Sequence, residues 1–346
     1  MKPKFNVGGQ AVIEGVMMRS PRSFAVAVRR PDGSIAVREQ KWASVMSKYR
    51  VLRWPFFRGM IVLFESMYNG MSALAFSADQ AASALDEGEK DTSTDTDGKS
   101  EGYLPKSAIF LTMMVSFALA IALFKFLPHM TTIGIGKLLG VEIPIDGFAF
   151  HIIDGVVKMF IFAGYIWGIS FMPDMKRVFM YHGAEHKSIA AYESGGPLTV
   201  EEARKYSRFH PRCGTSFIVV VLMVAIIMFA VVFRFLPPLS DNHYLNIILQ
   251  MFVKVPLMLP IAGLAYEFIK FSSSDSCPRA LRIFVLPGLW SQRITTSEPT
   301  DDMLEIALVS LKLSLAREHA SEQGEEVAFD PGAQGISIIN SLDEVA

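Results

Sequence analysis

Four long apolar runs constrain this chain more than any other feature of its sequence. Each is about 20 residues or longer, the length at which a helix rising roughly 1.5 Å per residue crosses the hydrocarbon layer of a membrane. They cover residues 107–127, 148–172, 216–236 and 244–270. Of the 346 residues, 51% are hydrophobic and only 19% are charged, a balance too apolar for a soluble domain. We therefore predict a mainly α-helical, polytopic membrane protein with four transmembrane helices, the first bounded at 105–127.

The distribution of Lys and Arg predicts how these spans are oriented, because positively charged loops tend to stay in the cytoplasm. Segment 173–215 contains seven Lys or Arg residues, segment 128–147 contains only Lys137, and segment 237–243 contains none. With four spans, this asymmetry places both termini and segment 173–215 in the cytoplasm. Segment 173–215 then joins the second and third spans on the inner side of the membrane.

A further stretch, residues 54–85, competes for a fifth span. It is apolar, but Arg58, Glu65 and Asn69 interrupt it. A fifth span would place either the basic N-terminus or the seven-cation segment on the outer side of the membrane. We therefore predict an interfacial or re-entrant helix at residues 54–85, one that does not cross the bilayer.

The N-terminal segment is strongly basic. Residues 1–58 carry 12 Lys or Arg residues against Glu14, Asp32 and Glu39, a net charge of about +9 that attracts anionic headgroups, so membrane lipid is an expected partner. Nucleic acid could use the same charge, but the segment lacks the fold signatures of nucleic-acid binding, and we expect no such partner. Polar residues interrupt any apolar core of a cleavable signal peptide, so we interpret the N-terminus as retained.

Two segments before the spans have recognisable local patterns. Residues 23–39 alternate apolar and polar side chains around residues 30–33 (Arg-Pro-Asp-Gly), which predicts a β-hairpin in a small N-terminal domain, residues 1–53. Residues 86–104 are acidic and rich in Ser, Thr and Gly, so we expect a flexible linker there.

The C-terminal segment, residues 271–346, contains an amphipathic helix. Thr300 can cap its first turn, in which Asp301 and Asp302 match the positive end of the helix dipole. Its apolar residues recur at three- and four-residue steps: Met303, Leu304, Ala307, Leu308, Leu311 and Leu315. One face should therefore pack on the N-terminal domain or lie on the membrane.

The predicted cytoplasmic segment carries the residues with the richest chemistry. We expect the second span to continue as a helix through residues 181–187 (Tyr-His-Gly-Ala-Glu-His-Lys), where a period of about 100° per residue places His182, His186 and Glu193 on one face. Imidazoles one helical turn apart can bind one metal ion. The His-x-x-Glu-His pattern is also that of inverted zinc hydrolases, in which the Glu, here Glu185, acts as general base.

A zinc site needs a further protein ligand. Glu193 is a local candidate, while His210 and Cys213 can fold back from the start of the third span. Two other interpretations stay open. The His pair can belong to a solvated helix face without metal, and Cys213, beside Arg212, can be a nucleophile with His210 as its base. Cys277 is the only other cysteine, so no disulfide framework is expected.

Two lysines lie inside the predicted spans. Lys158 and Lys254 each fall about ten residues from the outer end of their span, near the middle of the bilayer, where charge is expensive. Asp154 lies one turn from Lys158 and can pair with it, whereas Lys254 needs a partner from another helix or a wet cavity. These residues are either paired structural charges or part of a transport pathway.

Four motifs resemble those of a known family. They are residues 8–19 (Gly-Gly-Gln-Ala-Val-Ile-Glu-Gly-Val-Met-Met-Arg), 181–186, 211–217 (Pro-Arg-Cys-Gly-Thr-Ser-Phe) and 287–299, where Pro-Gly-Leu-Trp is followed by Gln-Arg-Ile-Thr-Thr and Glu-Pro. In this order they are similar to the YqhQ-like family of bacterial membrane proteins, over most of the chain. That family is a domain of unknown function with a label of metal-dependent enzyme. Glu14 and Arg19 match its N-terminal motif, where a turn-and-strand scaffold is the simplest role for them.

We therefore predict a metal-dependent enzyme, a hydrolase, at the cytoplasmic face of the bacterial inner membrane, with zinc as the expected metal. The predicted ligands are His182, His186, Glu193, His210 and Cys213, with Glu185 as general base. This location suggests a lipid-linked or membrane-protein substrate. The alternatives are a non-catalytic scaffold or assembly factor with a structural metal site, and a transporter that uses Lys158 and Lys254.

Overall fold

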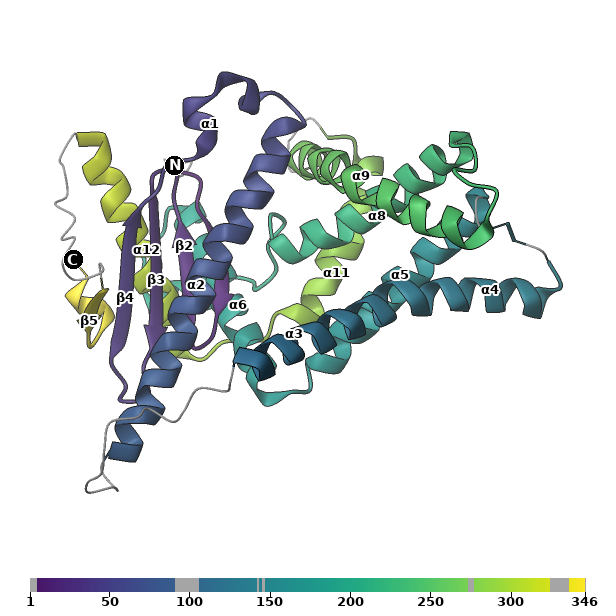
Figure 1. The fold of residues 1–346 in the computed structure, drawn as a ribbon. Coiled ribbons are helices and arrows are strands. Elements are labelled where there is room, and N and C mark those ends of the chain that lie inside the picture. Colours follow the sequence, from purple (N-terminus) through teal and green to yellow (C-terminus); the bar gives the residue numbers. More distant parts are fainter. Residues whose placement is uncertain are drawn as a thin grey trace.

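An antiparallel sheet stands beside a group of long helices (Figure 1). The structure, a computed structural model, describes residues 5–90, 106–141, 143–144, 147–272, 277–323 and 336–345. The strands are β1 (Gly8–Val12), β2 (Gly15–Arg19), β3 (Ser23–Arg29), β4 (Ile35–Lys41) and β5 (Ile336–Ile339). They pair in the order β1-β2-β3-β4-β5, and every pair is antiparallel. This sheet and the helical remainder confirm the predicted fold class.

Two hairpins build most of the sheet. The predicted hairpin is confirmed as β3–β4, with Arg29 opposite Ile35 and Gly33 in the left-handed region (φ 88°) of its turn. β1 and β2 form a second hairpin whose two-residue turn contains Glu14, also left-handed at φ 50°. Short hairpin turns require positive φ, which costs a non-glycine residue about 1–2 kcal/mol. Glu14 therefore needs contacts beyond its own turn.

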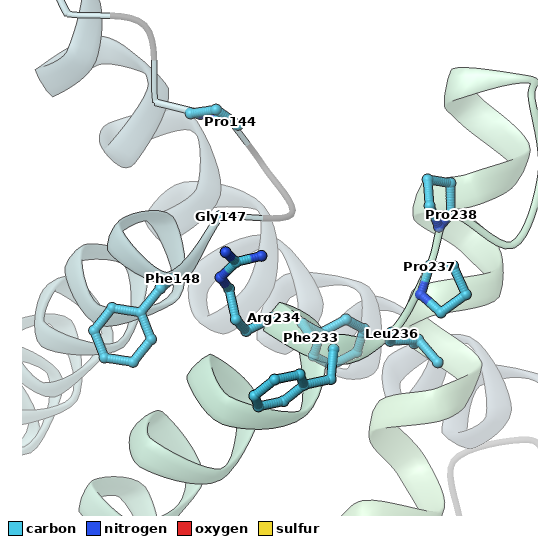
Figure 2. Close-up of a pocket in the computed structure, with 9 residues that line it drawn as sticks. Pro144, Gly147, Phe148, Phe233, Arg234, Leu236, Pro237 and Pro238 are labelled. Atoms are coloured by element: carbon cyan, nitrogen blue, oxygen red, sulfur yellow. The ribbon is translucent and has the colours of Figure 1, made fainter.

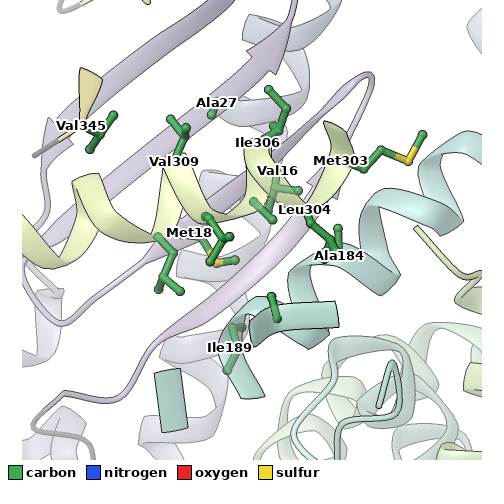
Figure 3. Close-up of a cluster of buried hydrophobic side chains, with 14 of the residues drawn as sticks. Val16, Met18, Ala27, Ala184, Ile189, Met303, Leu304, Ile306, Val309 and Val345 are labelled. Carbon is green, nitrogen blue, oxygen red and sulfur yellow. The ribbon is translucent and has the colours of Figure 1, made fainter. Parts of the chain in front are cut away.

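Opposite faces of the sheet pack on different helices. On one face, Val16, Met18 and Ala27 join apolar residues of α6 (Pro173–Ser194) and α12 (Asp301–Gln323), as Figure 3 shows. The side chains between them in the strands point the other way, so Met17, Val26 and Val28 contact Ala73 and Phe76 of α2 (Phe57–Lys90). This two-residue alternation buries both faces of the sheet.

The amphipathic C-terminal helix is observed as α12, which begins at Asp301, directly after Thr300. It packs on the sheet and on α6. Leu304, Leu308 and Leu311 are each no more than 1% exposed, and full burial of one such side chain contributes about 1.5–3 kcal/mol. The helix therefore fastens the C-terminal segment to the N-terminal sheet.

Within the residues that the structure describes, four helices are long and apolar enough to cross a membrane, in agreement with the predicted number of spans. They cover Met114–Leu139, Phe148–Ile169 (α5), Gly214–Phe235 (α8) and Ile248–Ser272, the last being part of α9 (His243–Ser272). Their faces are largely open to the outside: of the most apolar window in each, between 6% and 33% of the residues are buried within the protein. Lipid is the solvent that suits such surfaces.

The first span differs from its prediction. The helix consists of α3 (Lys106–Ile121), a π-helical turn η2 (Ala122–Phe126) and α4 (Leu127–Leu139), so it continues to residue 139 instead of ending at 127. Pro128 lies in the first turn of α4, directly after the π-helical turn, so its missing N–H falls at the junction where the backbone hydrogen-bond pattern of the helix changes. Gly140 then ends α4 in the left-handed conformation.

α2 covers the segment for which we predict a non-spanning helix, and among the described residues it is not one of the four apolar spans. It packs on the first three strands and on α9. Two of the three polar residues that interrupt its sequence have protein partners. Arg58 forms an ion pair with Glu267, and buried Glu65 accepts hydrogen bonds from Ser44 Oγ and Val45 N, each 2.8 Å long. The position of α2 at a membrane interface stays a prediction.

The other helical elements in the described part of the chain are short: α1 (Val45–Lys48), η1 (Arg50–Arg53), α7 (Val200–Arg204), α10 (Arg279–Arg282), η3 (Ile283–Val285), α11 (Leu286–Thr295) and η4 (Leu342–Glu344). α2 extends to Lys90. The rest of the predicted linker, residues 91–104, lies outside the described residues. Of the short elements, α11 bears most directly on the candidate site, because it packs against α8 at the end where that site lies.

Candidate metal centre

Both candidate histidines lie on α6, which is separate from the second apolar helix. The prediction of one continuous helix was wrong: α5 ends at Ile169, and α6 begins at Pro173 after Met172 in an extended conformation (ψ 129°). A residue before proline is disfavoured in the α region, and proline fits only the first turn of a helix. On α6, His182 and His186 are one turn apart, with ring centroids 4.4 Å from each other.

Backbone carbonyls orient both imidazoles in the same way. His182 Nδ1 lies 2.8 Å from Thr295 O, and His186 Nδ1 lies 2.5 Å from Arg208 O. A carbonyl oxygen can only accept, so in each ring Nδ1 carries the proton and donates it. Each neutral ring then presents an unprotonated Nε2, which is how metal-binding histidines are commonly held.

Cys213 brings a third donor atom to these nitrogens. It is the N-cap of α8, where its Sγ accepts a hydrogen bond from Thr215 N, and Sγ lies 3.1 Å from His182 Nε2. The potential ligand atoms of His182, His186 and Cys213 all lie within 4.8 Å of one another. Together they offer two imidazole nitrogens and one sulfur, a ligand set that suits zinc.

His186 Nε2 is the least satisfied atom of this group. The side chain is 1% exposed, and Nε2 is buried without a hydrogen-bond partner. Burial lowers the pKa of His186 below its ordinary value, which favours the neutral ring. An unpaired buried nitrogen costs about 1–3 kcal/mol. A bound cation would remove that cost.

Glu185 lies beside the same three residues. Its Oε2 is 3.8 Å from His182 Nε2 and 4.0 Å from His186 Nε2. The carboxyl group is buried, and burial raises its pKa above the ordinary value. Strand β1 closes over it: a Cβ at Gly9 would lie 2.6 Å from Glu185 Cγ. A glycine is therefore required where the N-terminal motif meets α6.

The loop that carries Cys213 is held by a residue that sequence reasoning missed. Gln292 of α11 is fully buried and accepts a hydrogen bond from His210 N at 2.9 Å. Its Nε2 donates to His210 O and to Ser216 Oγ, each at 2.7 Å. The signal for this role was the motif at 287–299, which also contains the Thr295 carbonyl that orients His182.

The chain after α11 runs against α6 at close range. A Cβ at Gly183 would lie 2.1 Å from Ser297 O, so only glycine allows this approach. Ser297 N donates to Phe179 O at 2.8 Å, and Lys187, which is 4% exposed, forms an ion pair with Glu298. These contacts keep Thr295 in place above the histidines.

The two other predicted ligands lie next to the group but outside it. Glu193 forms an ion pair with Arg212, and its Oε2 is 3.4 Å from His210 Nε2. The rings of His186 and His210 are 5.7 Å apart. The structure therefore brings together His182, His186 and Cys213. It places Glu193, in the last turn of α6, and His210, in the loop before α8, beside this group.

Glu14 connects the β1–β2 hairpin to α6 one turn before His182. Its carboxylate forms an ion pair with Arg177 and lies 3.3 Å from Tyr181 Oη. The hydrogen bond to Glu14 raises the pKa of Arg177, and burial raises that of Tyr181. These contacts offset the cost of the left-handed turn. The scaffold role predicted for Glu14 thus has a physical basis.

The fold and the site together define a polytopic membrane protein in which a sheet, helix α6, the start of α8 and a C-terminal segment enclose a group of potential metal ligands. The chain belongs to the family described as "Protein of unknown function (DUF1385)", whose model matches residues 54–317. It is 33% identical over 319 residues to the uncharacterized protein YqhQ of Bacillus subtilis (strain 168), an alignment that covers 92% of this chain and 95% of that protein. No solved structure matches.

Proposed function

We propose that the protein is a metal-dependent enzyme, a hydrolase, in which His182, His186 and Cys213 bind one divalent metal, with zinc the expected ion. The orientation of the two imidazoles carries this proposal. Each Nδ1 donates to a backbone carbonyl, so each Nε2 is left unprotonated and can coordinate. His182 Nε2 faces Cys213 Sγ at 3.1 Å, and the buried Nε2 of His186 has no hydrogen-bond partner. Three protein ligands leave one position of a tetrahedral zinc site open, as in catalytic zinc sites.

A metal held at these atoms supplies Lewis acidity and lowers the pKa of water. Glu185 then has the role of general base, because its carboxylate is within 4.0 Å of both free imidazole nitrogens. Gly9 and strand β1 cover it and exclude bulk solvent from that side. Gln292 holds the loop that positions Cys213. Glu193 and His210 have a supporting role here. The Glu193 carboxylate contacts His210 and Arg212, two residues of the loop that precedes Cys213.

The site's position on the chain favours a substrate at the membrane surface. Cys213 is the N-cap residue of α8, directly before an apolar span. The metal ligands therefore lie at one end of that span. The density of positive charge in segment 173–215 favours the cytoplasmic face of the bacterial inner membrane. A lipid-linked or membrane-protein substrate fits this place best.

A structural metal site in a non-catalytic scaffold or assembly factor is the second candidate. The observation that favours it is burial: Glu185, His186 and Cys213 are each no more than 6% exposed. The donor atoms also join α6 to the start of α8, which is where a structural ion would fasten two elements. In that case the metal would stabilise the fold, and Glu185 would be dispensable.

Metal content tests the ligand assignment. Full-length protein purified in detergent should contain about one equivalent of zinc or another divalent metal by elemental analysis, and His182→Ala/His186→Ala and Cys213→Ser should lose it. His319→Ala is the matched control, because that exposed histidine lies on α12 with its ring against Phe5. His210→Ala should also retain the metal. Equal metal content in the double variant and the wild type would contradict the proposal.

A further inference from the structure

Three lysines from three membrane helices lie close together, and none of them belongs to the group of metal ligands. Lys125 is in the π-helical turn η2, Lys158 in α5 and Lys254 in α9. Lys254 interacts electrostatically with both other lysines and with Asp154. Lys125 and Lys158 fall near the midpoints of their spans, where an uncompensated charge is expensive.

The charges of this cluster do not balance. Asp154 forms an ion pair with Lys158 one turn away on the same helix. Among the described residues, Asp154 is also the carboxylate with which Lys125 and Lys254 interact electrostatically. Three lysine side chains thus lie around one carboxylate. In a membrane interior this excess calls for a negative partner from outside the chain.

Unsatisfied polar atoms lie in the same place. His151 is 4% exposed and Asp154 is 5% exposed, yet His151 Nε2 and Asp154 Oδ1 are buried without hydrogen-bond partners. The Lys254 ammonium lies 4.9 Å from the centroid of the Phe233 ring, and the centroid of the His151 ring lies 5.1 Å from the same point. Phe233 therefore lies beside polar groups of this cluster, and a π-helical turn, common at functional sites, supplies Lys125.

A cavity of about 500 Å³ reaches the same phenylalanine from the end of the spans. It lies between the start of α5 and the end of α8, at the opposite end of α8 from Cys213. Figure 2 shows the guanidinium of Arg234 pointing into it, between Gly147 and Phe233. The exposed Arg234 thus lies at a cavity whose lining includes Phe233, the same ring that Lys254 approaches.

We propose that this cluster is a second site, which binds a phosphate-type anion, the group shared by an anionic phospholipid headgroup and inorganic phosphate. Arg234 receives the anion at the cavity, and Lys125 and Lys254 hold it. A phosphate group offers several acceptor oxygens to ammonium donors, and its charge offsets the excess of the three lysines. The proposal is independent of the metal site, because no residue belongs to both.

The test uses the full-length protein in detergent micelles, with unfolding followed by tryptophan fluorescence during heating. The probes are dihexanoylphosphatidylglycerol, zwitterionic dihexanoylphosphatidylcholine and inorganic phosphate. A ligand that binds the folded state raises Tm in proportion to its occupancy. Stabilisation by phosphatidylglycerol alone supports a lipid headgroup as the source, and stabilisation also by phosphate supports a site for the free anion. Equal effects of the two lipids, or no effect of any probe, would overturn the proposal.

Variants connect the response to the cluster. Lys254→Met should weaken the apparent affinity for the active probe at least about tenfold, and Lys254→Arg should retain it. Lys137→Met is the matched control, because this exposed lysine lies on α4 outside the cluster. It should respond as the wild type does. A response unchanged in Lys254→Met would overturn the proposal.

Asp154→Asn distinguishes an anion from a cation. Removing the carboxylate that the lysines share should strengthen binding of the anionic probe, because a competing negative charge is lost. If the variant binds the probe more weakly than the wild type does, the site does not take an anion between these lysines. This variant stays informative even where Lys254→Met does not fold.

Discussion

At the scale of single residues, Glu185 separates catalysis from scaffolding. Glu185→Gln keeps the shape of the side chain and removes its charge, so the metal should stay bound. If Glu185 is a general base, hydrolysis of a p-nitrophenyl ester or phosphodiester reporter by the metal-loaded protein should fall by a factor of about 10²–10⁴. Tm should stay equal or rise, because a buried carboxylate is replaced by a neutral amide.

Glu201→Gln is the control for this change, since this exposed carboxylate lies on α7, outside the group of ligand atoms. It should retain reporter hydrolysis. A structural metal site predicts the opposite outcome, in which neither substitution changes any rate. Hydrolysis that survives in Glu185→Gln would remove Glu185 from the chemistry while leaving the metal assignment intact.

Gly9 gives a residue-scale prediction about how the site is covered. In Gly9→Ala the new Cβ would lie 2.6 Å from Glu185 Cγ and 2.9 Å from Met17 O, so either the carboxylate or the strand must move. The free energy of unfolding should fall by about 1–3 kcal/mol. Gly8→Ala is the matched control, because a Cβ there meets nothing within 4 Å. The measurement is Tm of both variants in detergent, and equal Tm values would contradict the described approach.

At the scale of elements, α11 should decide whether Cys213 reaches the histidines. Gln292→Leu would leave His210 N, His210 O and Ser216 Oγ without their partners inside the protein. The expected loss of stability is about 2–5 kcal/mol, accompanied by loss of metal even though no ligand is changed. Gln323→Leu, at an exposed position near the end of α12, should change neither Tm nor metal content. Retention of the metal in Gln292→Leu would show that the loop holds its position without α11.

The elements that could be predicted from the sequence are those whose residue pattern lies within one continuous segment. Hydrophobic length identifies the four spans, and the alternation around residues 30–33 identifies the β3–β4 hairpin, because both patterns follow from the geometry of one element. The break between α5 and α6 was missed although Pro173 marks it, since the helical period of the His pair was extended backwards through it.

The candidate site divides in the same way. His182, Glu185 and His186 follow from the helical period of one segment. The roles of Gln292, Thr295 and Gly9 depend on contacts across 80 residues or more, as between Gln292 and His210, which are 82 residues apart. The residue pattern of a single helix or strand contains no information about such a long-range contact. For the same reason Cys213 could be proposed as a ligand but not separated from Glu193 and His210.

At the scale of the whole molecule, one hydrophobic core joins three distant parts of the chain. Val16 of the N-terminal sheet, Ala184 of α6 and Leu304 of α12 belong to the same buried cluster (Figure 3). A bilayer cannot pass through such a core, so these three parts must lie on one side of the membrane. That requires an even number of crossings between them, which agrees with four spans and with a non-spanning α2.

Cysteine labelling of spheroplasts tests this arrangement. Asp32→Cys and Glu201→Cys place single exposed thiols on the β3–β4 turn and on α7, and Asp241→Cys places one between α8 and α9. A membrane-impermeant maleimide should label Asp241→Cys in intact spheroplasts and the other two only after permeabilisation, because the positive charge of segment 173–215 favours the cytoplasm. Different labelling of Asp32→Cys and Glu201→Cys would contradict the shared core. Labelling of both in intact spheroplasts would keep the core but reverse the orientation, and would place the metal ligands at the outer face.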